Sequence, residues 1–198
     1  LQALQRLQPL NLYGQSKNTF DIWVAEQVAG RAAAPPQWAG LKFFNVYGPN
    51  EYHKGEQMSV VPQIFKQISE TGRARLFRSH NPNYEDGGQS RDFVWVGDCV
   101  EVMLWLEAQP TVSGVFNCGT GQARSFQDLA TAVFQATGKD VLIDYVPTPE
   151  AIRDKYQYFT EAKMAKLRAA GYDRPFTSLE KGVGRYVSDH LMLEDAHL

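Results

Sequence analysis

The fold class follows from the stretch Leu41-Lys42-Phe43-Phe44-Asn45-Val46-Tyr47-Gly48-Pro49. Its apolar residues form a short run that a Gly-Pro pair closes, which predicts a buried strand ending in a turn. A helical repeat of apolar residues precedes this strand over 13–29, with a stop at Gly30, and a second repeat follows it over 60–68. This alternation of helix and strand favours an α/β fold over a sandwich or a helical bundle.

The alternation continues to the end of the chain. Asp98 is expected to be the N-cap of a helix that contains Val102 and Leu106, and Ser125 the N-cap of a helix that runs to about 137. The segment 79–90 is polar and turn-rich, and it predicts a long loop. Further strands are predicted at 74–77, 92–96, 114–118 and 141–146, and further helices around 161–170 and 178–191.

The composition is that of an ordinary globular protein, and it excludes several classes of function. Hydrophobic residues make up 43% and charged residues 21% of the 198 residues, and a net charge of −2 gives no basis for binding a phosphate backbone. No apolar run approaches the roughly 18 residues of a membrane span, and the first residues do not resemble a signal peptide. We therefore expect a cytoplasmic protein with no nucleic-acid or membrane partner.

The two cysteines, Cys99 and Cys118, lie inside apolar runs and outside any CxxC pair. This placement favours two small, buried, reduced thiols over a disulfide. Reduced thiols agree with a cytoplasmic location.

Tyr13 and Lys17 are the first pair of residues with a chemical use. Residues four apart share one face of a helix, so the phenol and the ammonium point the same way. A nearby ammonium stabilises a phenolate, and such a tyrosine can exchange a proton with an alcohol while hydride leaves its carbon. The lysine can also reach the hydroxyls of a nicotinamide ribose. The same spacing arises by chance in many helices, so the pair alone leaves an ordinary surface role open.

A series of motifs in a fixed order makes the pattern far more specific. After the Tyr-x-x-x-Lys pair come Phe20-Asp21, Asn45-Val46-Tyr47-Gly48-Pro49, Arg91-Asp92-Phe93-Val94-Trp95-Val96-Gly97-Asp98 and Phe116-Asn117-Cys118-Gly119-Thr120-Gly121. In this order and at these spacings, nearly the whole chain resembles the extended short-chain dehydrogenase/reductase family. The resemblance implies the C-terminal portion of a Rossmann-type doubly wound sheet plus a smaller mixed α/β substrate-binding domain.

A narrower resemblance rests on three segments: Asn50-Glu51-Tyr52-His53-Lys54-Gly55, Tyr156-Gln157-Tyr158-Phe159-Thr160 and Arg168-Ala169-Ala170-Gly171-Tyr172. They are similar to segments of the epimerases that invert C6 of an ADP-linked glycero-manno-heptose in lipopolysaccharide precursor synthesis. This resemblance implies NADP as cofactor, with NAD as the alternative, together with an ADP-sugar substrate and a homo-oligomer.

The narrower resemblance also assigns roles to individual residues. Tyr13 and Lys54 would be the two acid/base catalysts on opposite sides of the sugar, because a carbon oxidised in one orientation and reduced in another needs a base for each. The residues implied to bind the cofactor are Tyr13, Lys17 and Lys54. The residues implied to bind the substrate are Asn45, Phe77, Arg91 and Tyr156.

Two of these substrate roles follow the chemistry of the side chains. The planar guanidinium of Arg91 suits the oxygens of a diphosphate, and Phe77 would lie near the ring of the nucleotide. Tyr156 would line the same nucleotide or phosphate site. His53 would orient the loop that carries the catalytic lysine.

Some features depart from the family pattern. The loop 79–90 is longer and richer in Asn and Gly than expected, and Glu56 and Gln63 stand where a serine and a histidine are expected near the substrate. Gly119-Thr120-Gly121 follows a late strand, so it is not predicted to be a dinucleotide fingerprint.

The resemblance divides the chain into two parts. Residues 1–50 would be the C-terminal part of the dinucleotide-binding domain and 51–198 mainly the substrate-binding domain, with about 91–125 returning to the Rossmann sheet. The family's Gly-rich turn and the Ser or Thr beside its catalytic tyrosine have no counterpart here, and the chain begins at Leu1. We therefore expect a piece of a longer chain that by itself neither holds NADP tightly nor epimerises efficiently.

Two other functions stay open. One is a different sugar-nucleotide epimerase or dehydratase on the same scaffold, which the pair His53-Lys54 argues against. The other is a non-catalytic module that binds a sugar nucleotide and has lost its redox half.

Overall fold

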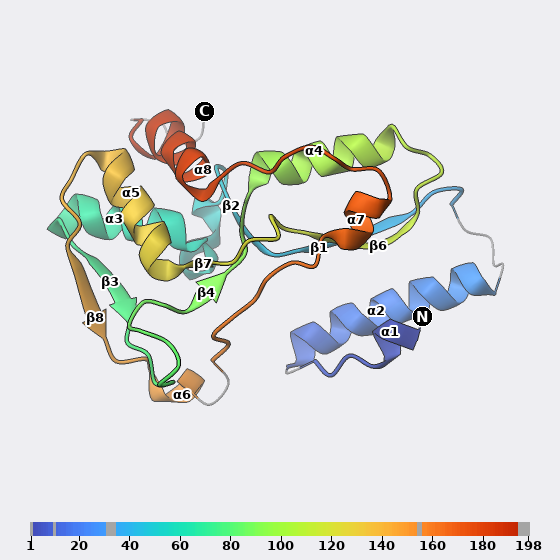
Figure 1. The fold of residues 1–198 in the computed structure, drawn as a ribbon, viewed down its shortest axis with the longest axis horizontal. Helices are drawn as coiled ribbons and strands as arrows, with labels where there is room; N and C mark the ends of the chain where they lie inside the picture. Colours follow the sequence, from blue (N-terminus) through green and yellow to red (C-terminus); the bar gives the residue numbers. More distant parts are fainter. Residues whose placement is uncertain (1, 10, 31–34, 154–155, 194–198) are drawn as a thin grey trace.

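The computed structural model describes residues 2–9, 11–30, 35–153 and 156–193, so the start at Leu1 lies outside the described residues (Figure 1). In chain order, the helices and strands are α1 (Gln2–Gln5), α2 (Leu12–Ala29), β1 (Ala39–Phe43), β2 (Asn45–Tyr47), η1 (Tyr52–Gln57), α3 (Val60–Thr71), β3 (Ala74–Phe77), β4 (Ser90–Arg91), β5 (Phe93–Trp95), α4 (Val96–Glu107), β6 (Gly114–Cys118), β7 (Arg124–Ser125), α5 (Phe126–Thr137), β8 (Ile143–Val146), α6 (Glu150–Arg153), α7 (Ala165–Ala169), α8 (Leu179–Tyr186) and η2 (Val187–Leu191).

The parallel pair β1–β6 carries helices on both of its faces. Side chains alternate along β1: Leu41 and Phe43 lie beside Met103 of α4, whereas Lys42 forms an ion pair with Asp21 of α2. Figure 1 shows the same arrangement, with α4 on one side of the pair and α2 on the other. Parallel strands covered on both faces by helices are the layering of a doubly wound α/β fold, so the predicted fold class is confirmed.

The stretch that decides the fold class is not one strand, as predicted, but two. The Phe44 N–H donates to the Cys118 carbonyl at 3.0 Å, whereas the Asn45 N–H donates to the Asp92 carbonyl at 2.9 Å. At this step the chain changes partner, and β2 pairs with β5 instead of β6. The predicted burial is also wrong at Phe43, which is 48% exposed because it borders a surface hollow beside α4.

The predicted strand 92–96 is shortened to β5, because Asp92 lies between β4 and β5 and belongs to neither. The Asp92 side chain is fully buried and accepts hydrogen bonds from the N–H and hydroxyl of Thr120 at 2.7 Å, from Gly121 N–H at 2.8 Å and from Ala162 N–H at 3.0 Å. Hydrogen bonds to a charged group stabilise a fold by about 1.5–3 kcal/mol each. β4 and β5 lie on either side of this hub, and Val96 already belongs to α4. The Gly-x-Gly turn at 119–121 gives its N–H groups to a carboxylate, which confirms that it is not a dinucleotide fingerprint.

The prediction that Asp98 caps α4 is wrong. The N-cap position is Trp95, and Asp98 lies in the first turn of the helix. The Asp98 carboxylate instead accepts hydrogen bonds from the N–H and hydroxyl of Thr177, at 2.8 and 2.9 Å. It therefore ties the segment that precedes α8 to α4.

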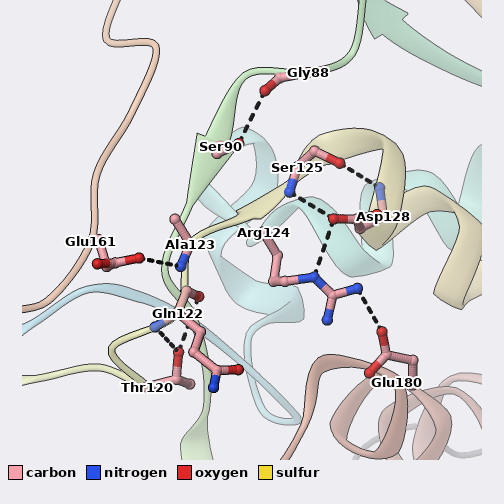
Figure 2. A network of polar contacts seen from close by, with 10 residues as sticks. All are labelled: Gly88, Ser90, Thr120, Gln122, Ala123, Arg124, Ser125, Asp128, Glu161 and Glu180. Carbon is pink, nitrogen blue, oxygen red and sulfur yellow. Dashed lines mark hydrogen bonds and ion pairs between the residues drawn. The ribbon is translucent and has the colours of Figure 1, made fainter.

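The predicted cap of α5 is confirmed, and it belongs to a wider network (Figure 2). The Ser125 hydroxyl accepts from Asp128 N–H at 2.9 Å and the Asp128 carboxylate accepts from Ser125 N–H at 3.1 Å, which is a capping box. Arg124 donates to Asp128 at 3.1 Å and to Glu180 at 2.7 Å. Because Glu180 lies on α8, this network joins α5 to α8.

Two hydrophobic clusters make up the core. One packs α3, α5 and α8 around β3, and the other packs α4 and α7 against β6. Cys99 and Cys118 lie in the second cluster and are both buried and free, which confirms the prediction of reduced thiols. The division of the chain at residue 50 stays a prediction.

The helix predicted at 178–191 comprises α8 and, from Val187, the π-helix η2. Two further predicted elements differ from their bounds at their beginnings. The strand predicted at 141–146 begins at Ile143, because Leu142 contributes only its carbonyl, to Ala74 N–H at 3.0 Å. The helix predicted at 161–170 is shorter and begins at Ala165; upstream of it, Ala162 N–H donates to the Asp92 carboxylate at 3.0 Å. None of the described helices combines the length and the apolar character that crossing a membrane requires.

Candidate active site

α2 presents Tyr13 and Lys17 at its beginning. The helix is capped by Asn11, whose side-chain oxygen accepts from Gly14 N–H at 2.8 Å. Lys17 Nζ lies 5.2 Å from the centroid of the Tyr13 ring, so the predicted shared face is confirmed. Tyr13 is 72% exposed and Lys17 is exposed as well, which leaves both functional groups accessible to a ligand.

These two residues fit one end of a nicotinamide dinucleotide. An accessible phenol beside an ammonium suits proton exchange with an alcohol and hydrogen bonding to ribose hydroxyls. The turn at 119–121 is unavailable to a pyrophosphate, since Asp92 takes its N–H groups. Within the described part of the chain, no group of three or more His, Cys, Asp or Glu side chains could hold a metal ion.

Lys54 lies on η1, in a tight turn that follows β2. Its N–H donates to the Glu51 carbonyl at 3.0 Å, and the turn contains two left-handed residues, Asn50 with φ 65° and Gly55 with φ 54°. Lys54 and His53 are both exposed. No hydrogen bond, ion pair or ring contact recorded for the described residues joins Lys54 to Tyr13, so their placement on opposite sides of a sugar stays a prediction.

Three of the predicted substrate-binding residues meet from separate parts of the chain. Phe77 ends β3, Arg91 ends β4, and Tyr156 lies between α6 and α7. The rings of Phe77 and Tyr156 meet edge to face, with centroids 6.2 Å apart. The Arg91 guanidinium lies 5.7 Å from the centroid of Tyr156 and 5.7 Å from that of Phe126. Phe77, Tyr156 and Phe126 line a cavity of about 420 Å³, which is large enough for a small ligand.

Arg91 has no anionic partner among the described residues. Its side chain donates to the neighbouring Ser90 carbonyl at 2.8 Å and otherwise contacts only aromatic rings. Burial lowers the pKa of Arg91, and Tyr156 partly offsets this; burial raises the pKa of Tyr156, and Arg91 opposes that. The ordinary pKa values of both groups lie far above 7, so at neutral pH the arginine is charged and the tyrosine neutral. A half-buried cation without a carboxylate is suited to an anionic ligand.

The cavity also contains residues that the sequence did not indicate. Gln89 is 1% exposed, and its side-chain amide donates to the carbonyls of Phe77 and Arg78 at 3.3 and 3.4 Å, which fixes the end of β3. Phe126 begins α5, and its ring centroid lies 5.7 Å from the Arg91 guanidinium. No local pattern marks these residues, because only the fold brings them to the cavity. Gln63, a departure from the family pattern, lines it too.

The other predicted positions lie apart from this cavity. Asn45 opens β2, where it pairs with Phe93, and its side chain is exposed. No contact recorded for the described residues joins it to Phe77, Arg91 or Tyr156. The side chain of Glu56 lies outside the described part of the structure.

The predicted loop 79–90 contacts Tyr158, which neighbours Tyr156 at the cavity. Ser79 N–H donates to the Asp86 carboxylate at 2.8 Å, and His80 N–H donates to the Tyr158 hydroxyl at 2.7 Å. The Tyr158 ring lies 5.0 Å from that of Tyr84 in the loop and 5.5 Å from Tyr156 at the cavity. The loop is thus linked to the cavity through Tyr158.

Comparison with known proteins defines the class. Residues 2–119 match the NAD dependent epimerase/dehydratase family, and the chain belongs to this family. Over 196 residues it is 55% identical to the ADP-L-glycero-D-manno-heptose-6-epimerase of Nitratidesulfovibrio vulgaris, with 99% of this chain and 59% of the relative covered. The chain thus spans less than two thirds of that relative.

Solved structures agree. The ADP-L-glycero-D-manno-heptose-6-epimerase of Helicobacter pylori superposes with a TM-score of 0.72 at 28% identity, covering 92% of this chain and 52% of that protein. The UDP-glucose 4-epimerase of Thermus thermophilus in complex with NAD gives 0.68 at 26% identity, covering 91% and 54%. The predicted Rossmann-type class and the resemblance to the heptose epimerases are confirmed.

Proposed function

We propose that this chain carries acid/base and nucleotide-contact residues of an epimerase that inverts C6 of ADP-glycero-manno-heptose, in the synthesis of the lipopolysaccharide core. The observation that carries the proposal is Arg91, a half-buried cation with no carboxylate partner among the described residues, whose guanidinium lies against two rings that line a cavity. A diphosphate supplies the missing charge, and an adjoining base supplies a ring for the aromatic side chains. The name of the relative that is 55% identical supports the choice of sugar.

Each of the proposed substrate-binding residues contacts a different part of the sugar nucleotide. Phe77 and Tyr156 contact the base and the adjoining phosphate, and Arg91 binds the diphosphate. Asn45 contacts the sugar closer to the reacting carbon. The support for this division is the common cavity of Phe77 and Tyr156, with Arg91 stacked on its wall.

Two side chains exchange protons with the C6 oxygen, one for each orientation of the sugar. Tyr13 takes the proton from one C6 epimer, and Lys17 stabilises its phenolate and binds the ribose of the cofactor. Lys54 takes the proton from the other C6 epimer and also contacts the cofactor. The chemistry that NADP supplies when bound is reversible acceptance of hydride. His53, beside Lys54, orients the loop.

Several finer assignments belong to the same proposal. The cofactor is NADP and not NAD, the substrate is an ADP-sugar, and the active form is a cytoplasmic homo-oligomer. The 198-residue chain alone binds NADP weakly and turns over poorly, since its relatives are longer.

The experiment that tests the nucleotide site is Arg91→Gln in the full natural protein that contains these residues, hereafter the full protein. We expect the KM for the ADP-sugar to rise about 10–100-fold, because hydrogen bonds to a charged group are lost. The value of kcat should change less than about threefold, since Arg91 binds ground state and transition state alike. Arg73→Gln is the control, because Arg73 pairs with Asp144 at the surface. An unchanged KM in Arg91→Gln would remove the main support for the proposal.

A further inference from the structure

Glu51 joins the two ends of the segment that carries Lys54. The Glu51 side chain is 5% exposed, and its Oε2 accepts from Ser59 N–H at 2.6 Å while its Oε1 accepts from the Ser59 hydroxyl at 2.7 Å. Lys54 lies within the segment 51–59 that these two bonds close. One carboxylate therefore fixes the distance between the entrance and the exit of the η1 turn.

The bond to Glu51 replaces the hydrogen bond that a serine usually makes at this position of a helix. Ser59 occupies the N-cap position of α3, where a serine hydroxyl ordinarily accepts from an N–H of the first turn. Here it makes no such cap bond and donates to Glu51. The Ser59 hydroxyl therefore stabilises the η1 turn and does not cap α3.

A third hydrogen bond ties Glu51 to the core. The Tyr186 hydroxyl donates to Glu51 Oε1 at 3.1 Å, and Tyr186 is buried in the cluster formed by α3, α5 and α8. Burial, together with the charge of Glu51, raises the pKa of Tyr186, so its hydroxyl stays protonated as a donor. The anchor of the turn is therefore held by a rigid part of the fold.

The backbone completes the connection from Glu51 to Lys54. The Glu51 carbonyl accepts from Lys54 N–H at 3.0 Å, and Met58 N–H donates to the Gly55 carbonyl at 3.2 Å. Within this bonded frame Lys54 is exposed and has no ion pair among the described residues. These bonds fix the position of the Lys54 backbone, and they leave its ammonium group available to a ligand.

We propose that Glu51 is a positioning residue for Lys54, acting through its bonds to Ser59 and Tyr186. This inference rests on the proposed function, in which Lys54 is an acid/base catalyst. The inference goes beyond the proposed function because it gives a role to a buried carboxylate that touches neither substrate nor cofactor. That role is to hold the catalytic lysine in place.

The test is Glu51→Gln in the full protein. The carboxylate accepts with both of its oxygens, whereas an amide has only one accepting oxygen. In Glu51→Gln, either Ser59 N–H loses its acceptor or the hydroxyls of Ser59 and Tyr186 must turn to accept, so the turn loosens and the lysine is misplaced. We expect kcat to fall about 10–100-fold with KM changed less than about threefold. Glu70→Gln, an exposed glutamate of α3, is the matched control and should leave both constants unchanged.

A double-mutant cycle separates positioning from a general structural role. If Glu51 acts through Lys54, Glu51→Gln should lower kcat no further once Lys54→Met is present. Full additivity of the two effects would overturn the inference while leaving the role of Lys54 intact. A Lys54→Met variant with normal kcat would instead refute the proposed function, and the inference with it.

Ser59→Ala provides a second variant in case Glu51→Gln does not fold. It removes the hydroxyl bond to Glu51 and leaves the bond from the Ser59 N–H. Since Ser59 makes no side-chain cap bond, α3 loses no N-cap, and thermal unfolding should show only the loss of one hydrogen bond to a carboxylate. We expect a smaller fall in kcat that also vanishes in the Lys54→Met background, and an additive fall would overturn the inference.

Discussion

Replacing Tyr13 with phenylalanine is expected to lower kcat in the full protein by about 100-fold to 10,000-fold, because the variant lacks the hydroxyl that we propose exchanges the proton. The fold should be unaffected, since Tyr13 is 72% exposed and its ring remains. The assay is the initial rate of C6 inversion followed by NMR, with thermal unfolding measured in parallel.

Tyr145→Phe is the matched control for this change. Tyr145 lies on β8 and its hydroxyl donates to Gln127 at 3.1 Å, far along the chain from α2. Its loss should leave kcat within about twofold of the parent, since only one surface hydrogen bond is removed. A Tyr13→Phe variant with near-normal kcat would show that the phenol is not an acid/base catalyst.

Replacing Lys54 with methionine is the second large effect we expect, with kcat again reduced by about 100-fold or more. The reason is that, in the proposed function, Lys54 is the base for one of the two orientations of the sugar, so inversion should fail although the other half-reaction survives. Each C6 epimer is therefore added separately, and the reduced cofactor that forms is followed by absorbance. The Lys54→Met variant should respond to one epimer and the Tyr13→Phe variant to the other.

Lys66→Met is the control for the lysine, because Lys66 is exposed on α3 and pairs only with Glu70. It should respond to both epimers as the parent does. An equal response of Lys54→Met to both epimers would refute the assignment of one base to each orientation.

The parts of the fold set by local sequence were predictable. The i, i+4 spacing of Tyr13 and Lys17 places both on one helix face, and the apolar repeat that begins at Val60 gives the helix α3. The strands β3 and β6 have the predicted bounds. These features depend on periodicity and turn residues that lie within a few positions of each other.

The features that depend on distant partners were not predictable. The partner change between Phe44 and Asn45 is decided by the carbonyls of Cys118 and Asp92, which lie on different strands. Asp98 has the pattern of an N-cap, but Thr177 is a partner that no local pattern indicates. In both cases a tertiary contact overrides a local preference.

The candidate site divides in the same way. Motifs indicated Phe77, Arg91 and Tyr156 individually; the structure places Phe77 and Tyr156 in the lining of one cavity and Arg91 against the ring of Tyr156. Gln89, which fixes the end of β3, carries no motif of its own, because its importance comes from its two carbonyl partners.

The most direct test of the central claim is to incubate the full protein with NADP and one C6 epimer of ADP-glycero-manno-heptose, and to follow the sugar by NMR. We expect a mixture of the two C6 epimers, with the configuration at every other carbon retained. A sugar that stays unchanged, while the same preparation inverts C4 of a UDP-hexose, would contradict that claim.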